Sequence, residues 1–73
     1  MTNNSRTNEC DDIYDIASGV QELETPTNHE LLDAADNFYH AANCYDRNGD
    51  RKMAAKCYTL AGEFYMSIAD SNN

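Results

Sequence analysis

The stretch that decides the fold occurs twice, 20 residues apart in the chain. It reads AADNFYHAANCY over residues 34–45 and AAKCYTLAGEFY over residues 54–65. Small residues recur in pairs at matching offsets, and aromatic rings recur at 38 and 45 and again at 58 and 65. Small side chains let two helix backbones approach closely while rings fill the space between them. The repeat therefore predicts two helices that pack against each other.

The segments around the two copies supply the signals that begin and end these helices. Between the copies lies Asp46-Arg47-Asn48-Gly49-Asp50, whose Asn-Gly favours a turn and whose Asp50 can cap the next helix. Before the first copy, Thr27 and Glu30 have the spacing of a capping box. We therefore expect an all-α fold with an antiparallel hairpin of helices over about 28–47 and 51–70.

A third helix is expected over about residues 10–24. Its apolar residues have helical spacing and form one narrow stripe: Ile13, Ile16, Ala17, Val20 and Leu23. Acidic residues in its first turns would complement the helix dipole, and Pro26 would stop it. This amphipathic helix should pack across the hairpin, giving a single three-helix domain over 9–70 between a disordered tail (1–8) and a frayed C-terminus (71–73).

The hairpin resembles a tetratricopeptide (TPR) repeat and is similar to the helical hairpins of soluble NSF attachment proteins. The resemblance covers about residues 31–66 and rests on Phe38, Ala42, Tyr45, Gly49-Asp50, Ala54, Tyr58 and Ala61. Met66 stands where the family usually has a proline, and there is one repeat, whereas a TPR groove needs about three. The resemblance implies a protein-interaction fold, and no binding residues are carried over from the family.

Charge is unevenly distributed along the chain, whose net charge is -8. Residues 1–46 hold ten acidic residues and one basic residue, whereas residues 47–73 hold three acidic and four basic residues. The acidic part would repel phosphates, so direct binding to nucleic acid is not expected. A protein partner with a basic surface is the natural complement.

The chemistry-bearing residues do not form a recognisable catalytic or metal site. The three cysteines (Cys10, Cys44 and Cys57) form no C-x-x-C pair, and we expect reduced, partly buried thiols, with a Cys44–Cys57 bridge as the alternative. His40 and Cys44 have metal-ligand spacing, but no second pair completes the site. We expect no enzymatic activity, no cofactor and no metal.

The function expected from these features is that of a small acidic adaptor or inhibitor that binds another protein by steric occlusion or bridging. The third helix is apolar on more sides than two neighbours can cover, which predicts a homodimer or a bound partner. The expected apolar anchors are Tyr39, Phe64, Tyr65 and Met66, and the expected acidic face consists of Asp11, Asp12, Asp15 and Glu22.

Other interpretations of the same features remain open. The acidic face is either a solvated surface or a docking surface. As a docking surface it could imitate nucleic-acid phosphates and occupy a DNA- or RNA-binding protein. The chain could instead be a structural subunit of a larger assembly. With no secretory signal or membrane span in the sequence, we expect a cytoplasmic location, or the host cytoplasm if the chain is virus-encoded.

Overall fold

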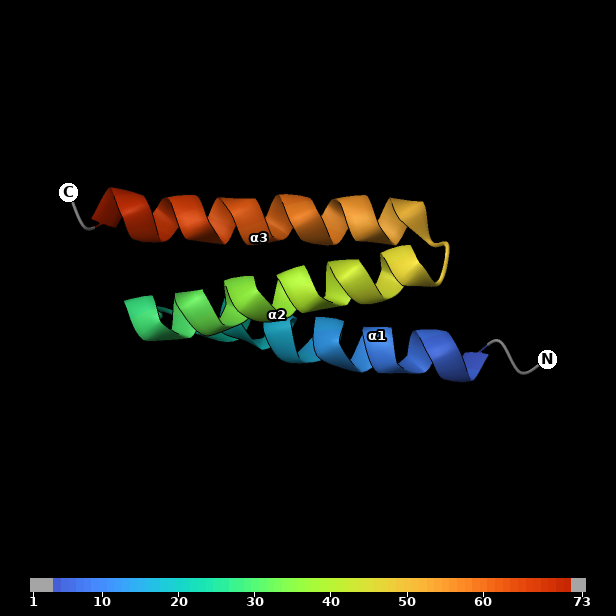
Figure 1. Ribbon diagram of the computed structural model, residues 1–73. Helices are drawn as coiled ribbons and strands as arrows, with labels where there is room; N and C mark the ends of the chain where they lie inside the picture. The colour runs from blue at the N-terminus through green and yellow to red at the C-terminus, as the bar shows by residue number, and fades with distance from the viewer. Residues whose placement is uncertain (1–3, 72–73) are drawn as a thin grey trace.

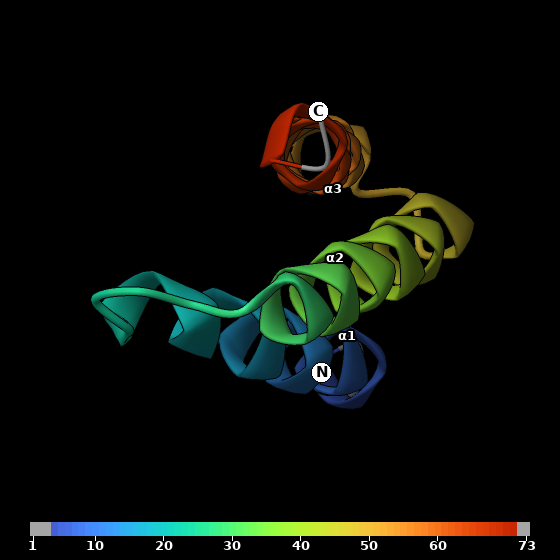
Figure 2. The same cartoon turned by 90° about the vertical axis from the view of Figure 1, so that its left-hand side faces the viewer.

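The computed structural model describes residues 4–71, which form three α-helices and one 3-10 turn without any strand (Figure 1). The elements are α1 (Asn4–Ser18), η1 (Gly19–Glu22), α2 (Asn28–Arg47) and α3 (Arg51–Ser71). Both α1 and α3 pack on α2, which lies between them and runs antiparallel to each (Figures 1 and 2). The expected all-α fold and helical hairpin are confirmed. No helix in the described range is both long and apolar enough to cross a bilayer.

The hairpin forms where the local signals place it. The Thr27 hydroxyl accepts a hydrogen bond from the Glu30 N–H at 3.1 Å, and the Glu30 carboxylate accepts one from the Thr27 N–H at 2.8 Å. Gly49 adopts φ +84°, a conformation that glycine takes without strain. Asp50 then caps α3 by accepting a hydrogen bond from the Met53 N–H at 3.2 Å. The sequence-based bounds of both hairpin helices are correct to within one residue.

The first helix differs from its expected form. It begins at Asn4 and ends at Ser18, so residues 4–8 are helical rather than a disordered tail, and residues 1–3 and 72–73 lie outside the described part. Gly19 is a poor helix former, and the chain tightens there into η1. Because α1 starts early, its acidic residues do not lie in the first turn, and the expected helix-dipole role is wrong. The helix also lies along α2 rather than across the hairpin.

The core consists of two clusters along α2, each of which contains one of its buried aromatic residues. Tyr45 is 2% exposed and lies among cysteines and alanines of all three helices. Phe38 is fully buried, with Tyr14 edge-on to it at 5.7 Å and Phe64 stacked on it at 5.5 Å between ring centroids. Each neighbour comes from a different helix, so Phe38 joins α1 and α3 through α2.

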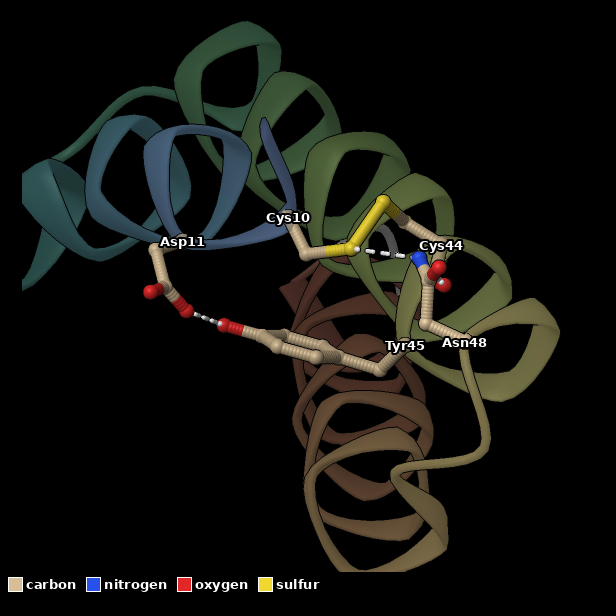
Figure 3. Close-up of a disulfide and its surroundings, with 5 residues drawn as sticks. All are labelled: Cys10, Asp11, Cys44, Tyr45 and Asn48. Atoms are coloured by element: carbon tan, nitrogen blue, oxygen red, sulfur yellow. Dashed lines mark hydrogen bonds between the residues drawn. A yellow bond between two sulfur atoms is a disulfide. The ribbon is translucent and has the colours of Figure 1, made fainter. Parts of the chain in front are cut away.

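Contrary to expectation, Cys10 and Cys44 form a disulfide, whereas Cys57 is a buried free thiol (Figure 3). The reason is the antiparallel packing of α1 on α2, which brings the two Cα atoms to 5.5 Å, within the range that a disulfide spans. The expectation of reduced thiols is wrong for this pair, and the alternative Cys44–Cys57 bridge is not formed. Burial raises the pKa of the Cys57 thiol.

A hydrogen bond next to the disulfide provides a second link between α1 and α2 (Figure 3). Asp11 follows Cys10 and Tyr45 follows Cys44, and the Tyr45 hydroxyl donates to the Asp11 carboxylate. Asn48, directly after α2, also contacts both cysteines. Its side-chain amide donates to the Cys44 carbonyl at 2.8 Å and to the Cys10 sulfur at 3.6 Å. The middle of α1 is therefore fastened to the C-terminal end of α2 by covalent and polar contacts together.

Tyr45 makes the stability of the fold sensitive to high pH. Burial, and next the hydrogen bond to Asp11, raise the pKa of the Tyr45 phenol well above its ordinary value of 10.0. Folding therefore favours the neutral phenol, and this contribution is fully present below about pH 10 and is lost as the pH rises through the folded-state pKa. We expect the melting temperature to fall more steeply above about pH 10 in the wild type than in Tyr45→Phe. Thermal melts that show an equal fall in melting temperature above about pH 10 for both proteins would contradict this assignment.

Candidate protein-binding surfaces

A groove opens between α1–η1 and the first half of α2. Its volume is about 240 Å3, and its lining residues are Ile16, Ala17, Val20, Leu23, Glu30, Asp33, Ala34 and Asn37. The floor is aliphatic, and Glu30 and Asp33 bring carboxylates to the edge on α2. We call this set of eight residues the acidic-rimmed groove.

The groove lies where the end of α1 and η1 pack on α2, which is the main neighbour of α1. Ala17 and Val20 face α2 and are buried, whereas Ile16 remains 68% exposed and Leu23 44% exposed. Two large aliphatic side chains, one on α1 and one directly after η1, thus stay in contact with water. Burying such side chains completely is worth about 1.5–3 kcal/mol each, which provides a driving force for docking a partner here.

The rim of the groove is negatively charged. Asp33 is exposed, and its carboxylate lies 3.9 Å from the imidazole of His29, which is mostly exposed as well. The Glu30 side chain stays at the start of α2, because the capping box orders it. Glu30 and Asp33 are both exposed beside the aliphatic lining, although the Glu30 carboxylate also accepts hydrogen bonds from Thr27. Their negative charge complements a basic, amphipathic partner.

The four residues of the expected acidic face have different environments. Asp11 accepts the hydrogen bond from Tyr45 and so contributes to the fold. Asp12, Asp15 and Glu22 are exposed. Asp12 lies one helical turn before Ile16, so the negative surface of α1 continues from the groove.

The four expected apolar anchors differ in exposure and in the contacts they make. Phe64 stacks on Phe38 and is partly buried. Tyr39 is 48% exposed and meets the Tyr58 ring edge-on at 5.8 Å between centroids, on the surface where α2 and α3 pack. Met66 is 67% exposed on α3.

The fourth anchor, Tyr65, is fastened to α2. Its hydroxyl donates to the Asp36 carboxylate at 2.5 Å, and this hydrogen bond, followed by burial, raises the pKa of the Tyr65 phenol. Similarly, the Tyr58 hydroxyl donates to Asn43 at 2.7 Å. These two polar contacts hold the tyrosine rings along the α2–α3 boundary while leaving about two fifths of each exposed.

The sequence placed Ile16 and Leu23 in the buried stripe and did not identify them as surface residues. A signal was present, because Ile16 and Ala17 are neighbours that point about 100° apart on a helix, and one packing partner covers only one of these directions. Between residues 4 and 71, no group of three histidine, cysteine or acidic residues could hold a metal ion. The thiol of the His40–Cys44 pair is consumed by the disulfide.

Comparison with known proteins gave no match: no family model, curated protein or solved structure is significantly similar to this chain. The resemblance to TPR hairpins therefore remains a prediction. The candidate surfaces stand on the geometry of the chain itself.

Proposed function

We propose that this chain is a non-catalytic protein-binding module that accepts a basic amphipathic helix of another protein. The observation that carries this proposal is the acidic-rimmed groove, where exposed Ile16 and Leu23 lie beside the carboxylates of Glu30 and Asp33. Apolar residues of the partner helix would enter the groove, and its Lys or Arg residues would lie over the rim. A bound helix would be sterically occluded from other contacts, which suits an inhibitor or an adaptor.

A designed peptide provides the probe for this proposal. It is a fluorescent, helix-forming peptide with leucines on one face and lysines on the other, and its matched control has glutamate in place of every lysine. We expect the leucine–lysine peptide to bind with micromolar affinity, more weakly at high salt because exposed charges are screened. The leucine–glutamate peptide should not bind.

Two matched substitutions to aspartate, one in the groove and one elsewhere on the surface, test whether the peptide binds in the groove. Ile16→Asp and Met66→Asp each replace a side chain that is about two-thirds exposed (68% and 67%) with an acid of the same charge. Fluorescence anisotropy should show that Ile16→Asp weakens peptide binding about tenfold or more, as expected for the loss of one buried aliphatic group. Met66→Asp should bind as the wild type does. Equal loss in both variants, or a wild type that does not bind the peptide, would contradict the proposal.

The same assay discriminates the phosphate-mimic alternative. A chain that imitates nucleic acid would depend on its exposed carboxylates and not on the aliphatic floor. Binding that is lost in Asp12→Asn/Asp15→Asn and unchanged in Ile16→Asp would favour that alternative over the groove.

The disulfide bears on where such binding takes place. Disulfides persist in oxidising environments and are rare in the cytosol, where thiol systems reduce them. The Cys10–Cys44 bridge thus favours an oxidising environment over the cytoplasmic location expected from the sequence. Small domains in such environments commonly use disulfides to supplement a limited core.

A further inference from the structure

We propose that a second copy of this chain docks on the outer surface of α3, antiparallel to it, and forms a two-fold symmetric dimer. The contact would use the face of α3 that points away from α2. This inference is independent of the acidic-rimmed groove, which α1, η1 and α2 form on another part of the molecule.

The outer face of α3 has the spacing of a helix-packing seam. Its members alternate by four and three residues and are all exposed: Ala55, Thr59, Gly62, Met66 and Ala69. We call these five residues the outer stripe. Residues with this spacing share one face of a helix, and a second helix can pack along such a face. Most of the stripe is small, which permits close approach of two backbones.

Gly62 lies at the centre of the stripe, and neither packing nor backbone conformation within the chain requires glycine there. A Cβ atom at this position would meet no other atom within 4 Å, and the backbone has no positive φ there. Glycine inside a helix costs about 1 kcal/mol relative to alanine. A helix that approaches Gly62 from outside gives this glycine a packing role that the isolated chain does not.

The charges along α3 favour a second copy of this chain, in antiparallel orientation, as the partner on the outer stripe. Arg51 and Lys52 lie at the beginning of the helix, and Asp70 lies near its end. An antiparallel copy centred near Gly62 brings Lys52 next to Asp70 of the second copy at both ends of the contact. A parallel copy would bring like charges together. The surface is therefore complementary to itself, as an isologous two-fold interface requires.

Two tyrosines supply anchors along one edge of the outer stripe. Tyr58 and Tyr65 are 38% and 41% exposed, and their hydroxyls are held by Asn43 and Asp36. In the antiparallel arrangement, Tyr58 of one copy lies opposite Tyr65 of the other. Aromatic rings that are already ordered lose little entropy on binding and contribute strongly to interfaces. Because α3 spans only about 30 Å, we expect a micromolar dimer rather than a permanent one.

Sedimentation equilibrium on the oxidised protein tests the dimer, over concentrations from about 5 μM to about 500 μM. The wild type should approach twice the monomer mass of 8.2 kDa at the upper end. Gly62→Glu should raise the dissociation constant about tenfold or more, because a charged side chain would occupy the centre of the contact. Ser67→Glu, which adds the same charge at an exposed position outside the stripe, should change it less than about twofold.

A charge exchange tests the orientation of the two copies. Lys52→Glu and Asp70→Lys should each weaken the dimer about threefold, and the double variant should return to within about twofold of the wild type. A wild type that remains monomeric, or equal dissociation constants for Gly62→Glu and Ser67→Glu, would overturn the proposal. Gly62→Glu should still bind the leucine–lysine peptide. The dimer proposal can therefore be disproved without disproving peptide binding in the groove, and the reverse.

Discussion

Reduction of the Cys10–Cys44 disulfide is expected to lower the free energy of unfolding by about 3–4 kcal/mol. The two cysteines are 34 residues apart in sequence, and a closed loop of this length removes that much conformational freedom from the unfolded chain. A domain of this size is stable by only about 4–10 kcal/mol, so the loss is a large part of the total. Urea titrations with and without reductant, followed by circular dichroism, measure the difference.

Two cysteine variants provide the controls for this result. Cys10→Ala/Cys44→Ala should have the lower stability from the start and should not respond to reductant. Cys57→Ala should respond as the wild type does, because its thiol is not part of the bridge. Alkylation of the unfolded, unreduced protein should label one cysteine only. Labelling of all three, or a wild type whose urea midpoint is unchanged by reductant, would contradict the disulfide.

Phe38→Ala should destabilise the fold by about 3–5 kcal/mol. The ring is fully buried and contacts Tyr14 of α1 and Phe64 of α3, so its removal leaves a cavity between all three helices. The helices have few other large side chains to fill this space, because alanines form much of the remaining core. We expect the variant to be largely unfolded at room temperature, with loss of helical circular dichroism.

The neighbouring Tyr39→Ala is the matched control for Phe38→Ala. Tyr39 is 48% exposed and contacts the Tyr58 ring, so its truncation should cost about 1 kcal/mol. The two substitutions remove aromatic rings from adjacent positions of α2 and differ in burial. Similar urea midpoints for both variants would show that the core is not arranged around Phe38.

The sequence could predict the hairpin because its signals act locally. Thr27, Gly49 and Asp50 fix helix ends through contacts within a few residues, and the repeated alanines fix the face that packs. The extent of α1 could not be predicted in the same way. Its first turns carry no apolar residue, and the effect of Gly19 depends on packing against α2 that the local pattern does not specify.

The disulfide illustrates the limit of reasoning from separate helices. Cys44 is 34 residues from Cys10 and 13 from Cys57. Each of these two cysteines lies on a helix that runs antiparallel to α2 (Figure 1). Only the rotation of α1 and α3 about their axes decides between them, and it places Cys10 within bonding distance.

The candidate site was less predictable than the fold. The acidic composition pointed to a basic partner, and the anchors predicted from the sequence lie on α2 and α3 and do not include Ile16 and Leu23. Exposure of these two residues results from the layered arrangement, in which α1 and η1 pack mainly on α2. The number of neighbours of a helix is a tertiary property, and hydrophobic periodicity gives only the direction of its apolar stripe.

The central claim is that the acidic-rimmed groove binds a basic amphipathic helix, and the most direct measurement is an NMR titration of the 15N-labelled, oxidised protein with the leucine–lysine peptide. We predict that amide shifts change along one path, through Ile16, Val20 and Leu23 and across to Asp33 and Asn37. The amide signals of the outer stripe should not shift when the protein concentration is below the dissociation constant of the dimer. Shift changes confined to α3, or no change at saturating peptide, would contradict the claim.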